Sequence, residues 1–425
     1  MLGVPTVFLA ASLVGAAFTA LALAPPRRPA VLSFPFFMAG WVAAELAFFH
    51  IAWQAVATIG FVALGGLDGA AGWAALAVTV ASWIGLLAAA RSQREAERVL
   101  AGALDELIGV DLREQEAERA VTAVVPVVSR RQLLSPFRMR PGEVEAVRDL
   151  AYGDDRRHRL DVYRRRGGTE PGPVLLQIHG GAWVVGDKRQ QGQPLLHHLA
   201  ERGWVGVAPN YRRSPGATFP DHLVDVKRAL AWVREHGAEY GADPDFVVVT
   251  GGSAGGHLAA LLALTPNDPV YQPGFEHVDT SVSACVPMYG VYDFLDQHGV
   301  RGRAAMRPFL ERFVMKCSPA ECRDRWEAAS PLNHVRADAP PFFVAHGGHD
   351  TLAWVEEARW FVDALRAVSE SPVLYAELPR TQHAFDVMYT VRTAHVVDAI
   401  SRWLEHLRPG ALADPAAVAS IDLKS

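Results

Sequence analysis

Residues 246–264 read FVVVTGGSAGGHLAALLAL. The apolar, β-branched part before Gly251 predicts a buried strand, and the strong helix formers after Gly256 predict a helix. Between them Ser253 lies in the pattern Gly-x-Ser-x-Gly. This pattern is typical of a sharp strand-to-helix turn, because only glycines leave room for the backbone there. The turn would hold the Ser253 hydroxyl at a helix N-terminus, where free amides favour negative charge. An ordinary glycine-rich turn is the alternative.

A second glycine-rich loop follows a strand that lies earlier in the chain. Residues 174–178 (VLLQI) predict a fully apolar strand, and His179-Gly180-Gly181-Ala182-Trp183 follows it directly. Glycines in such a loop let backbone amides point into a pocket, where they can bind the oxyanion of an acyl-transfer reaction. We expect an oxyanion hole formed by the N–H groups of Gly180, Gly181 and Ala254. The alternative is an ordinary β-turn.

A serine hydroxyl needs a base, and the base needs an orienting acid. Asp350 follows the predicted strand 342–345, and His383 follows the predicted strand 373–378. The chain order Ser, Asp, His is that of hydrolases whose nucleophile stands on such a turn. We therefore expect Ser253 to be the nucleophile, His383 the general base and acid, and Asp350 the partner of His383.

Other residues of the same types compete for these roles. Asp293 and Asp386 are the rival acids. His257 lies on the helix that leaves the turn, and His179 precedes the oxyanion loop, so both are interpreted as structural.

Strand-like and helical segments alternate from about residue 144 to residue 410. This alternation predicts an α/β fold, with a mostly parallel sheet covered by helices on both faces. The strand-like segments are 160–163, 174–178, 205–208, 246–250, 284–288, 342–345 and 373–378.

Together these motifs resemble the serine esterases and lipases of the α/β-hydrolase superfamily. The resemblance covers roughly Val144 to Pro409. It is strongest to the branch with a His-Gly-Gly oxyanion loop, which contains hormone-sensitive-lipase-like and arylacetamide-deacetylase-like enzymes. Residues 209–215 (PNYRRSP) are similar to the Asp-Tyr-Arg-Leu-Ala-Pro segment of that group. Ala182 and Gly252 depart from it, where the loop has a third glycine and hormone-sensitive-lipase-like enzymes have Asp. These departures bring the chain closer to carboxylesterases and kynurenine-formamidase-like enzymes.

The first ninety residues are almost uncharged, whereas nearly all the charge of the chain lies after Arg91. Apolar runs of this length can cross a hydrocarbon core of about 30 Å. We predict a transmembrane region, residues 1–90, with helices at about 2–24, 31–53 and 72–90. The resemblance extends to membrane-anchored bacterial esterases with such an extension. A cleaved signal peptide ending near Ala24 is the alternative, but it lacks a basic start and Pro25 would follow the cut.

Basic residues set the expected orientation. Arg27 and Arg28 lie in the first loop, and Arg91, Arg94 and Arg98 follow the third helix. The positive-inside rule then predicts a multi-pass protein of the cell membrane with its C-terminal domain on the cytoplasmic side.

The segments that flank the catalytic domain carry weaker patterns. Residues 91–143 predict an amphipathic connector that could also act as a cap, and residues 411–425 a flexible tail. Cys317 and Cys322 could pair, but we expect free thiols, as in a reducing compartment. The mild net charge of −5 makes a nucleic-acid partner unexpected.

The sequence therefore predicts a membrane-anchored carboxylesterase or lipase that acts on a small-molecule or lipid ester. The resemblance implies neither a metal nor an organic cofactor, and no oligomeric state is predicted. We expect a substrate pocket lined by Trp183, Tyr211, Met288 and Phe294, with residues 293–330 adding to it or forming a lid. An amidase or formamidase with the same triad is the first alternative, and a non-catalytic binding protein on the same scaffold is the second.

Overall fold

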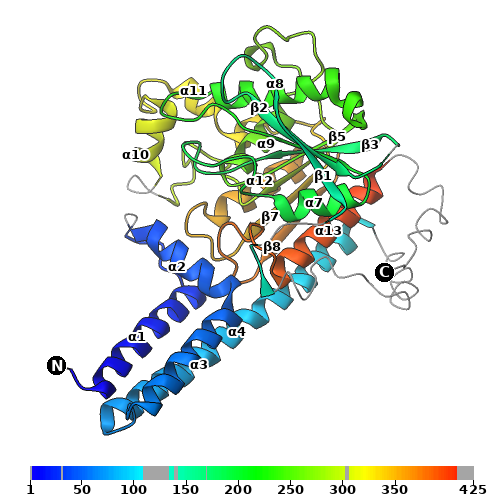
Figure 1. Ribbon diagram of the computed structural model, residues 1–425. Coiled ribbons are helices and arrows are strands. Elements are labelled where there is room, and N and C mark those ends of the chain that lie inside the picture. Colours follow the sequence, from blue (N-terminus) through cyan, green and yellow to red (C-terminus); the bar gives the residue numbers. More distant parts are fainter. Residues whose placement is uncertain are drawn as a thin grey trace.

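Three long apolar helices project as a stalk from a domain built around one sheet (Figure 1). This arrangement is taken from a computed structural model, which describes residues 2–29, 32–108, 134–137, 142–168, 170–301 and 306–408. We call residues 142–408 the sheet domain.

Over the described residues, the sheet has eight strands in the order β1-β2-β4-β3-β5-β6-β7-β8. Strand β2 pairs antiparallel with β1 and β4, and the other neighbours pair parallel. The predicted mostly parallel α/β sheet is therefore confirmed. The strands are β1 Val144–Ala151, β2 Arg159–Arg165, β3 Gly172–Ile178, β4 Val205–Pro209, β5 Ala242–Gly252, β6 Ala284–Met288, β7 Phe342–Gly347 and β8 Val373–Leu378.

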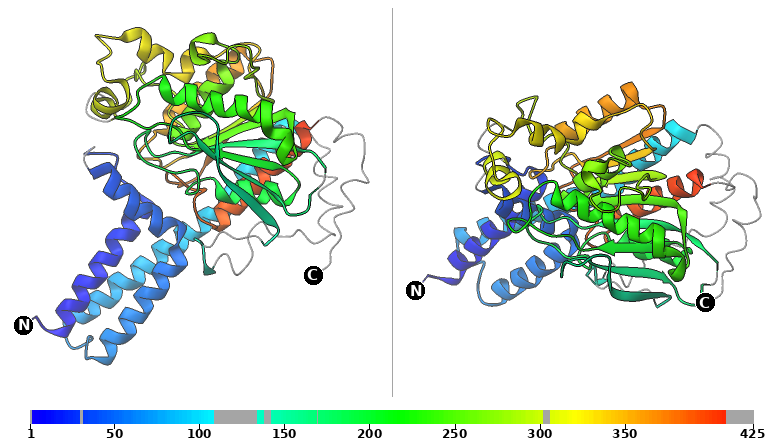
Figure 2. Two further views of the ribbon diagram at one scale, coloured as in Figure 1. Left: turned by 45° about the horizontal axis from the view of Figure 1, so that its top comes forward. Right: turned by 90° about the horizontal axis from the view of Figure 1, so that it is seen from above.

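Helices cover both faces of the sheet, as Figure 2 shows. Successive strand residues point to opposite faces, so Val174 and Leu176 pack with α8, α9 and α12, whereas Leu175 packs with α7 and α13. Strands buried on both faces need continuous apolar sequence, which is why residues 174–178 lack alternation. The α-helices of this domain are α7 Gln193–Glu201, α8 Asp221–His236, α9 Ala254–Leu264, α10 Arg307–Phe309, α11 Arg323–Ala328, α12 Val355–Val368 and α13 Val391–Leu407.

Short helical turns complete the sheet domain. They are η2 Gly237–Tyr240, η3 Pro269–Tyr271, the π-helical η4 Leu310–Met315 and η5 Pro331–His334.

The stalk consists of α1 Val4–Leu23, α3 Ala47–Ala63 and α4 Ala70–Ile108. Hydroxyl pairs join α1 to α4: the Oγ1 of Thr19 lies 2.7 Å from the Oγ of Ser82, and Thr79 donates to the Oγ of Ser12 at 2.9 Å. The outer surface is apolar, with large side chains such as Ile59 exposed. In the described part of the chain, two helices are long and apolar enough to span a membrane, or three if the bent pair α2–α3 is counted as one span.

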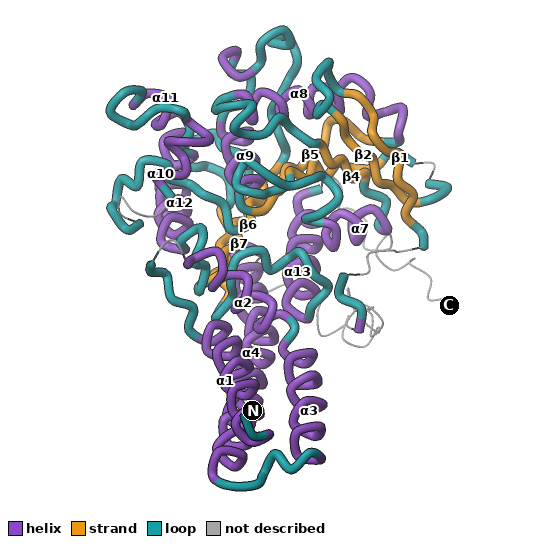
Figure 3. The backbone as a smooth tube through the Cα atoms, turned by 60° about the vertical axis from the view of Figure 1, so that its left-hand side comes forward, coloured by secondary structure: helices purple, strands orange, loops and turns teal. Residues whose placement is uncertain are grey.

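The predicted second helix, 31–53, is wrong. The chain forms α2 Ser33–Glu45 and then α3, and the two axes meet at 89°. The break lies at Leu46, directly after Glu45. Glu45 is buried, and both of its carboxylate oxygens accept hydrogen bonds. Arg392 of α13 donates to one oxygen, and the hydroxyl of Thr390, directly before α13, donates to the other at 3.0 Å. This pairing holds α2 against the sheet domain, and Figure 3 shows the helix in that position.

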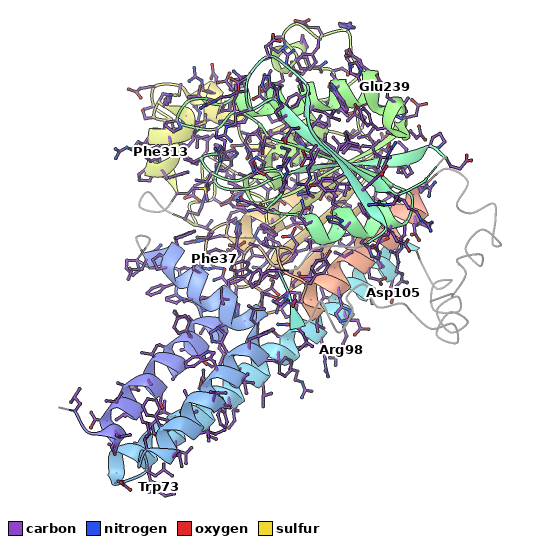
Figure 4. All side chains as sticks on the ribbon, viewed as in Figure 1. Phe37, Trp73, Arg98, Asp105, Glu239 and Phe313 are labelled. Atoms are coloured by element: carbon purple, nitrogen blue, oxygen red, sulfur yellow. A yellow bond between two sulfur atoms is a disulfide. The ribbon has the colours of Figure 1, made fainter. Side chains whose placement is uncertain are left out.

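Helix α4 joins the predicted third helix to the predicted connector without a break, over 39 residues. Its last turns bury Ala96, Leu100 and Leu104 against the sheet face that α13 covers. Figure 4 labels Trp73 at the far end of the stalk and Asp105 where α4 runs beside the sheet domain. Residues 109–133 and 138–141 of the predicted connector, and the predicted tail, lie outside the described residues.

The expected free thiols at Cys317 and Cys322 are also a wrong prediction, because a disulfide joins them. The chain reverses just before the pair, where Lys316 has a positive φ of 55°, and Trp326 donates to the carbonyl of Cys317 at 3.1 Å. This turn brings the two Cα atoms to 6.2 Å, within reach of a bridge.

The pair formed by Glu45 and Arg392 predicts a large effect on stability. Glu45→Ala leaves the buried guanidinium without its partner, and we expect the free energy of unfolding to fall by about 3–5 kcal/mol. Thermal unfolding in detergent measures this loss.

Two further variants give the controls. Glu327→Ala breaks an exposed pair with Arg323, and we expect a loss of at most about 1 kcal/mol. Glu45→Leu combined with Arg392→Met should recover most of the stability. Equal losses for Glu45→Ala and Glu327→Ala would contradict the role of the buried pair.

Candidate active site

Ser253 lies between β5 and α9 in a strained conformation. Its φ is 59° and its ψ is −122°, a region that non-glycine residues rarely occupy. The neighbouring backbones are close: a Cβ on Gly251 would lie 2.6 Å from the carbonyl oxygen of Ile178, and one on Gly256 would lie 2.8 Å from that of Met288. Gly251 and Gly256 are therefore required because β3 and β6 flank the turn closely.

Gly252 has a separate reason to lack a side chain. A Cβ there would overlap the phenol group of Tyr289. The Tyr289 hydroxyl donates to Asp386, and its ring lies 4.6 Å from the His383 ring, centroid to centroid. Tyr289 thus fills the place where a side chain at position 252 would lie, which accounts for the departure at Gly252.

His383 and Asp350 are joined by a short hydrogen bond. The Nδ1 of His383 lies 2.6 Å from the Oδ2 of Asp350, and both residues are buried. The other carboxylate oxygen accepts from the backbone N–H groups of Leu352 and Ala353 at 2.8 and 2.9 Å. Burial raises the pKa of Asp350, but His383 and His346 outweigh it and hold that pKa below its ordinary value. Asp350 is therefore a carboxylate that can orient the imidazole.

The two rival acids hydrogen-bond to residues other than His383. Asp386 accepts from Tyr289, and Asp293 accepts from the backbone N–H of Gln297 at 2.6 Å. Burial raises the pKa of Asp386. Among the described contacts, Asp350 is the acid that hydrogen-bonds to His383.

The His-Gly-Gly loop presents fewer free amides than expected. The N–H of Gly180 donates to the Oε1 of Gln191 at 2.7 Å, so it is not available to an oxyanion. Within the described part of the chain, the N–H groups of Gly181 and Ala254 have no hydrogen-bond acceptor. Gly181 has a φ of 114°, a conformation that favours glycine. The predicted set of three donors is therefore reduced to Gly181 and Ala254.

Two histidines of this region are structural. His179 stacks on Tyr211 with ring centroids 4.4 Å apart, and burial lowers its pKa to about 4. The Nε2 of His257 lies 2.7 Å from the carbonyl oxygen of Ala329, and its Nδ1 accepts from Trp183.

A cavity of about 520 Å³ opens beside Ser253 and His383, a size that is typical of small-molecule sites. Gly181, Ala182 and Trp183 line one side. The insertion 293–330 contributes a second wall with Arg301, Met306 and Phe309. The N-terminal segment contributes a third wall with Arg27, Ser33, Phe34 and Phe37.

Of the four predicted pocket residues, only Trp183 lines this cavity. Tyr211 is buried behind the loop, where its hydroxyl donates to the carbonyl of His179 at 3.0 Å. Met288 is buried in the sheet core, and Phe294 stacks on His257 behind Trp183. These three side chains therefore do not face the cavity, and Phe294 contacts the Trp183 ring edge-on from behind. Among the described residues, no group of three His, Cys, Asp or Glu side chains is arranged to hold a metal ion.

Comparison with known proteins identifies a family model and relatives that this chain is similar to. A family model described as BD-FAE matches residues 160–365. The chain is 48% identical over 339 residues to the probable carboxylic ester hydrolase LipM of Mycobacterium tuberculosis, covering 77% of this chain and 76% of that protein. It is 42% identical over 332 residues to the esterase LipQ of the same organism, covering 76% and 77%.

The chain belongs to the carboxylic ester hydrolases of the α/β-hydrolase fold. A solved structure of the thermophilic esterase Est2 of Thermogutta terrifontis aligns with a TM-score of 0.52 and 25% identity, covering 63% of this chain and 92% of that one. The expected serine esterase family is thereby confirmed.

Sequence reasoning missed the part of this esterase site that comes from the N-terminal segment. Phe37 is buried, and its ring meets that of His383 edge-on with centroids 5.8 Å apart. Two features pointed to it: the aromatic cluster 34–37 (FPFF), and the charge of Glu45 inside an otherwise apolar run.

The hydrogen bond between Gly180 and Gln191 predicts that a substitution at Gln191 lowers kcat. Gln191→Ala removes the bond that fixes Gly180 and loosens the loop that carries Gly181. We expect kcat to fall about five- to tenfold, the equivalent of one neutral hydrogen bond. The neighbouring Gln190 is exposed, so Gln190→Ala is the matched control and should retain the wild-type kcat. A kcat unchanged in Gln191→Ala would show that this bond does not fix the loop.

Proposed function

We propose that this carboxylic ester hydrolase is a membrane-attached serine esterase or lipase with the triad Ser253, His383 and Asp350. The observation that carries the proposal is the 2.6 Å hydrogen bond between His383 and Asp350. His383 and Ser253, the latter at its strained turn, line the same cavity. The low pKa of Asp350 supports a charged partner for the imidazole.

In the proposed reaction the Ser253 Oγ attacks the ester carbonyl carbon, and its proton passes to the Nε2 of His383. The oxyanion is bound by the N–H groups of Gly181 and Ala254. The C–O bond to the alcohol then breaks, and the alcohol leaves with the proton from His383. Water repeats the sequence on the acyl-enzyme, which releases the acid and restores Ser253.

The exposed apolar side chains of the stalk support membrane attachment. Soluble surfaces rarely expose contiguous apolar area of this extent, and α1 and α4 have the length and composition of spans. Two observations bear on the side of the membrane. The arginines of the first loop favour the cytoplasm, whereas the disulfide between Cys317 and Cys322 favours an oxidising compartment. Arg27 pairs with Glu356 at 2.7 Å, so its position also has a structural reason.

An amidase or formamidase would use the same triad, and the choice depends on the leaving group. The names of the two mycobacterial relatives favour esters. The non-catalytic alternative is disfavoured because such proteins usually lose a triad member, and this chain retains all three.

The triad predicts the outcome of substitution at Asp350. Asp350→Asn should reduce kcat by about 10⁴, because the imidazole loses its orienting charge, and Ser253→Ala should reduce it at least as far. Hydrolysis of p-nitrophenyl esters from acetate to palmitate measures this, with the matching anilides as amide substrates.

Asp386→Asn is the matched control, because Asp386 is a buried carboxylate of the same region that does not bind His383. It should retain far more activity than Asp350→Asn. Thermal unfolding shows whether each variant is folded. Full ester turnover by folded Ser253→Ala would refute the triad, and turnover of anilides in preference to esters would favour the amidase.

A further inference from the structure

The cavity beside Ser253 has a wall that comes from outside the hydrolase fold. Helix α2 and the loop before it contribute Arg27, Ser33, Phe34 and Phe37. Figure 4 labels Phe37 on α2, where that helix meets the sheet domain. The edge-on contact of its ring with His383 makes α2 a direct neighbour of the proposed base.

Contacts before, within and at the end of α2 fix this wall. Arg27 pairs with Glu356 and lies over the Trp354 ring at 5.0 Å. Within the helix, the Nε1–H of Trp41 donates to the carbonyl of Ala384, the residue after His383, at 3.1 Å. At its end, Glu45 is held by Arg392. A helix fastened along its length is a constant part of the binding site.

The same helix leads directly into the stalk. Only Leu46 separates α2 from α3, and α2 turns by 89° from the stalk helix. Figure 3 shows that α2 lies where the apolar helices meet the sheet domain, and the cavity that α2 lines is therefore at this junction. Its rim carries exposed apolar side chains from both parts: Phe34 is 61% exposed, and Val185, on the loop after Trp183, is 61% exposed.

We propose that α2 is the acyl-binding wall of the site, and that it admits esters with long apolar acyl chains from the bilayer. This inference rests on the proposed esterase function and names the substrate class of that site. An exposed apolar rim is costly in water but is suited to a chain that leaves a hydrocarbon phase. Phe34 contacts the chain at the mouth, and Phe37 contacts it beside His383.

Phe34 gives the sharpest test, because an exposed side chain can be replaced without disturbing the core. Phe34→Ser should lower the ratio of kcat/KM for p-nitrophenyl palmitate to that for p-nitrophenyl butyrate by about tenfold, the range for a lost apolar contact in a pocket. Phe37→Ala should lower it as well.

Met38 provides the matched control. It lies on the same helix and is 38% exposed, but it does not line the cavity. Met38→Ser should leave the ratio unchanged. An unchanged ratio in Phe34→Ser, or an equal fall in Met38→Ser, would overturn the acyl-wall assignment. Absence of any Ser253-dependent ester turnover in the wild type would instead refute the proposed function.

Entry from the bilayer has its own test. The full-length protein is reconstituted in phosphatidylcholine vesicles, and a fluorogenic palmitoyl ester that does not exchange between vesicles is placed either in the same vesicles or in separate ones. We expect hydrolysis at least about tenfold faster in the shared vesicles. Equal rates would contradict delivery through the membrane.

Discussion

The site depends on the close approach of the glycine turn to its two neighbouring strands. Backbone at Gly251 and Gly255 meets the carbonyl of Ile178, and Gly256 meets that of Met288. Strands β3, β5 and β6 pair in parallel and end at one edge of the sheet, where their backbones lie so close that there is no room for a Cβ at these positions. The same contact sets the loop after Ile178, with Gly181, beside Ser253. One steric constraint thus places the proposed nucleophile and the amides that we propose bind the oxyanion.

The second organising feature is the junction between the stalk and the sheet domain. Glu45 and Arg392 are both buried, and each would be costly to bury alone. Their pairing bends the apolar segment at Leu46 and keeps α2 on the sheet domain. A segment that has the composition of a membrane span therefore becomes part of the wall of an enzyme pocket. In the function that we propose, one continuous piece of chain both attaches the protein to the membrane and binds the substrate.

The features that could be predicted well from the sequence are local. The turn at Ser253 is visible because its strand, glycines and helix are adjacent in the chain, and the family follows from motifs in a fixed order. The features that it missed depend on contacts between distant segments. The N–H of Gly180 donates to Gln191. Tyr211 and Phe294 pack behind the loop, and α2 ends where Arg392 binds Glu45. None of these contacts is visible from hydropathy, which counts Phe34 and Phe37 simply as apolar residues of a span.

We propose that the strained turn, the imidazole and the carboxylate together make Ser253 a nucleophile. The most direct measurement is peptide mass spectrometry after treatment of the full-length protein with a fluorophosphonate, which reacts with activated serines. A single adduct on Ser253, formed much more slowly in His383→Ala, is the predicted result. No adduct on Ser253 in folded protein, or labelling at the same rate in His383→Ala, would show that these groups do not activate Ser253.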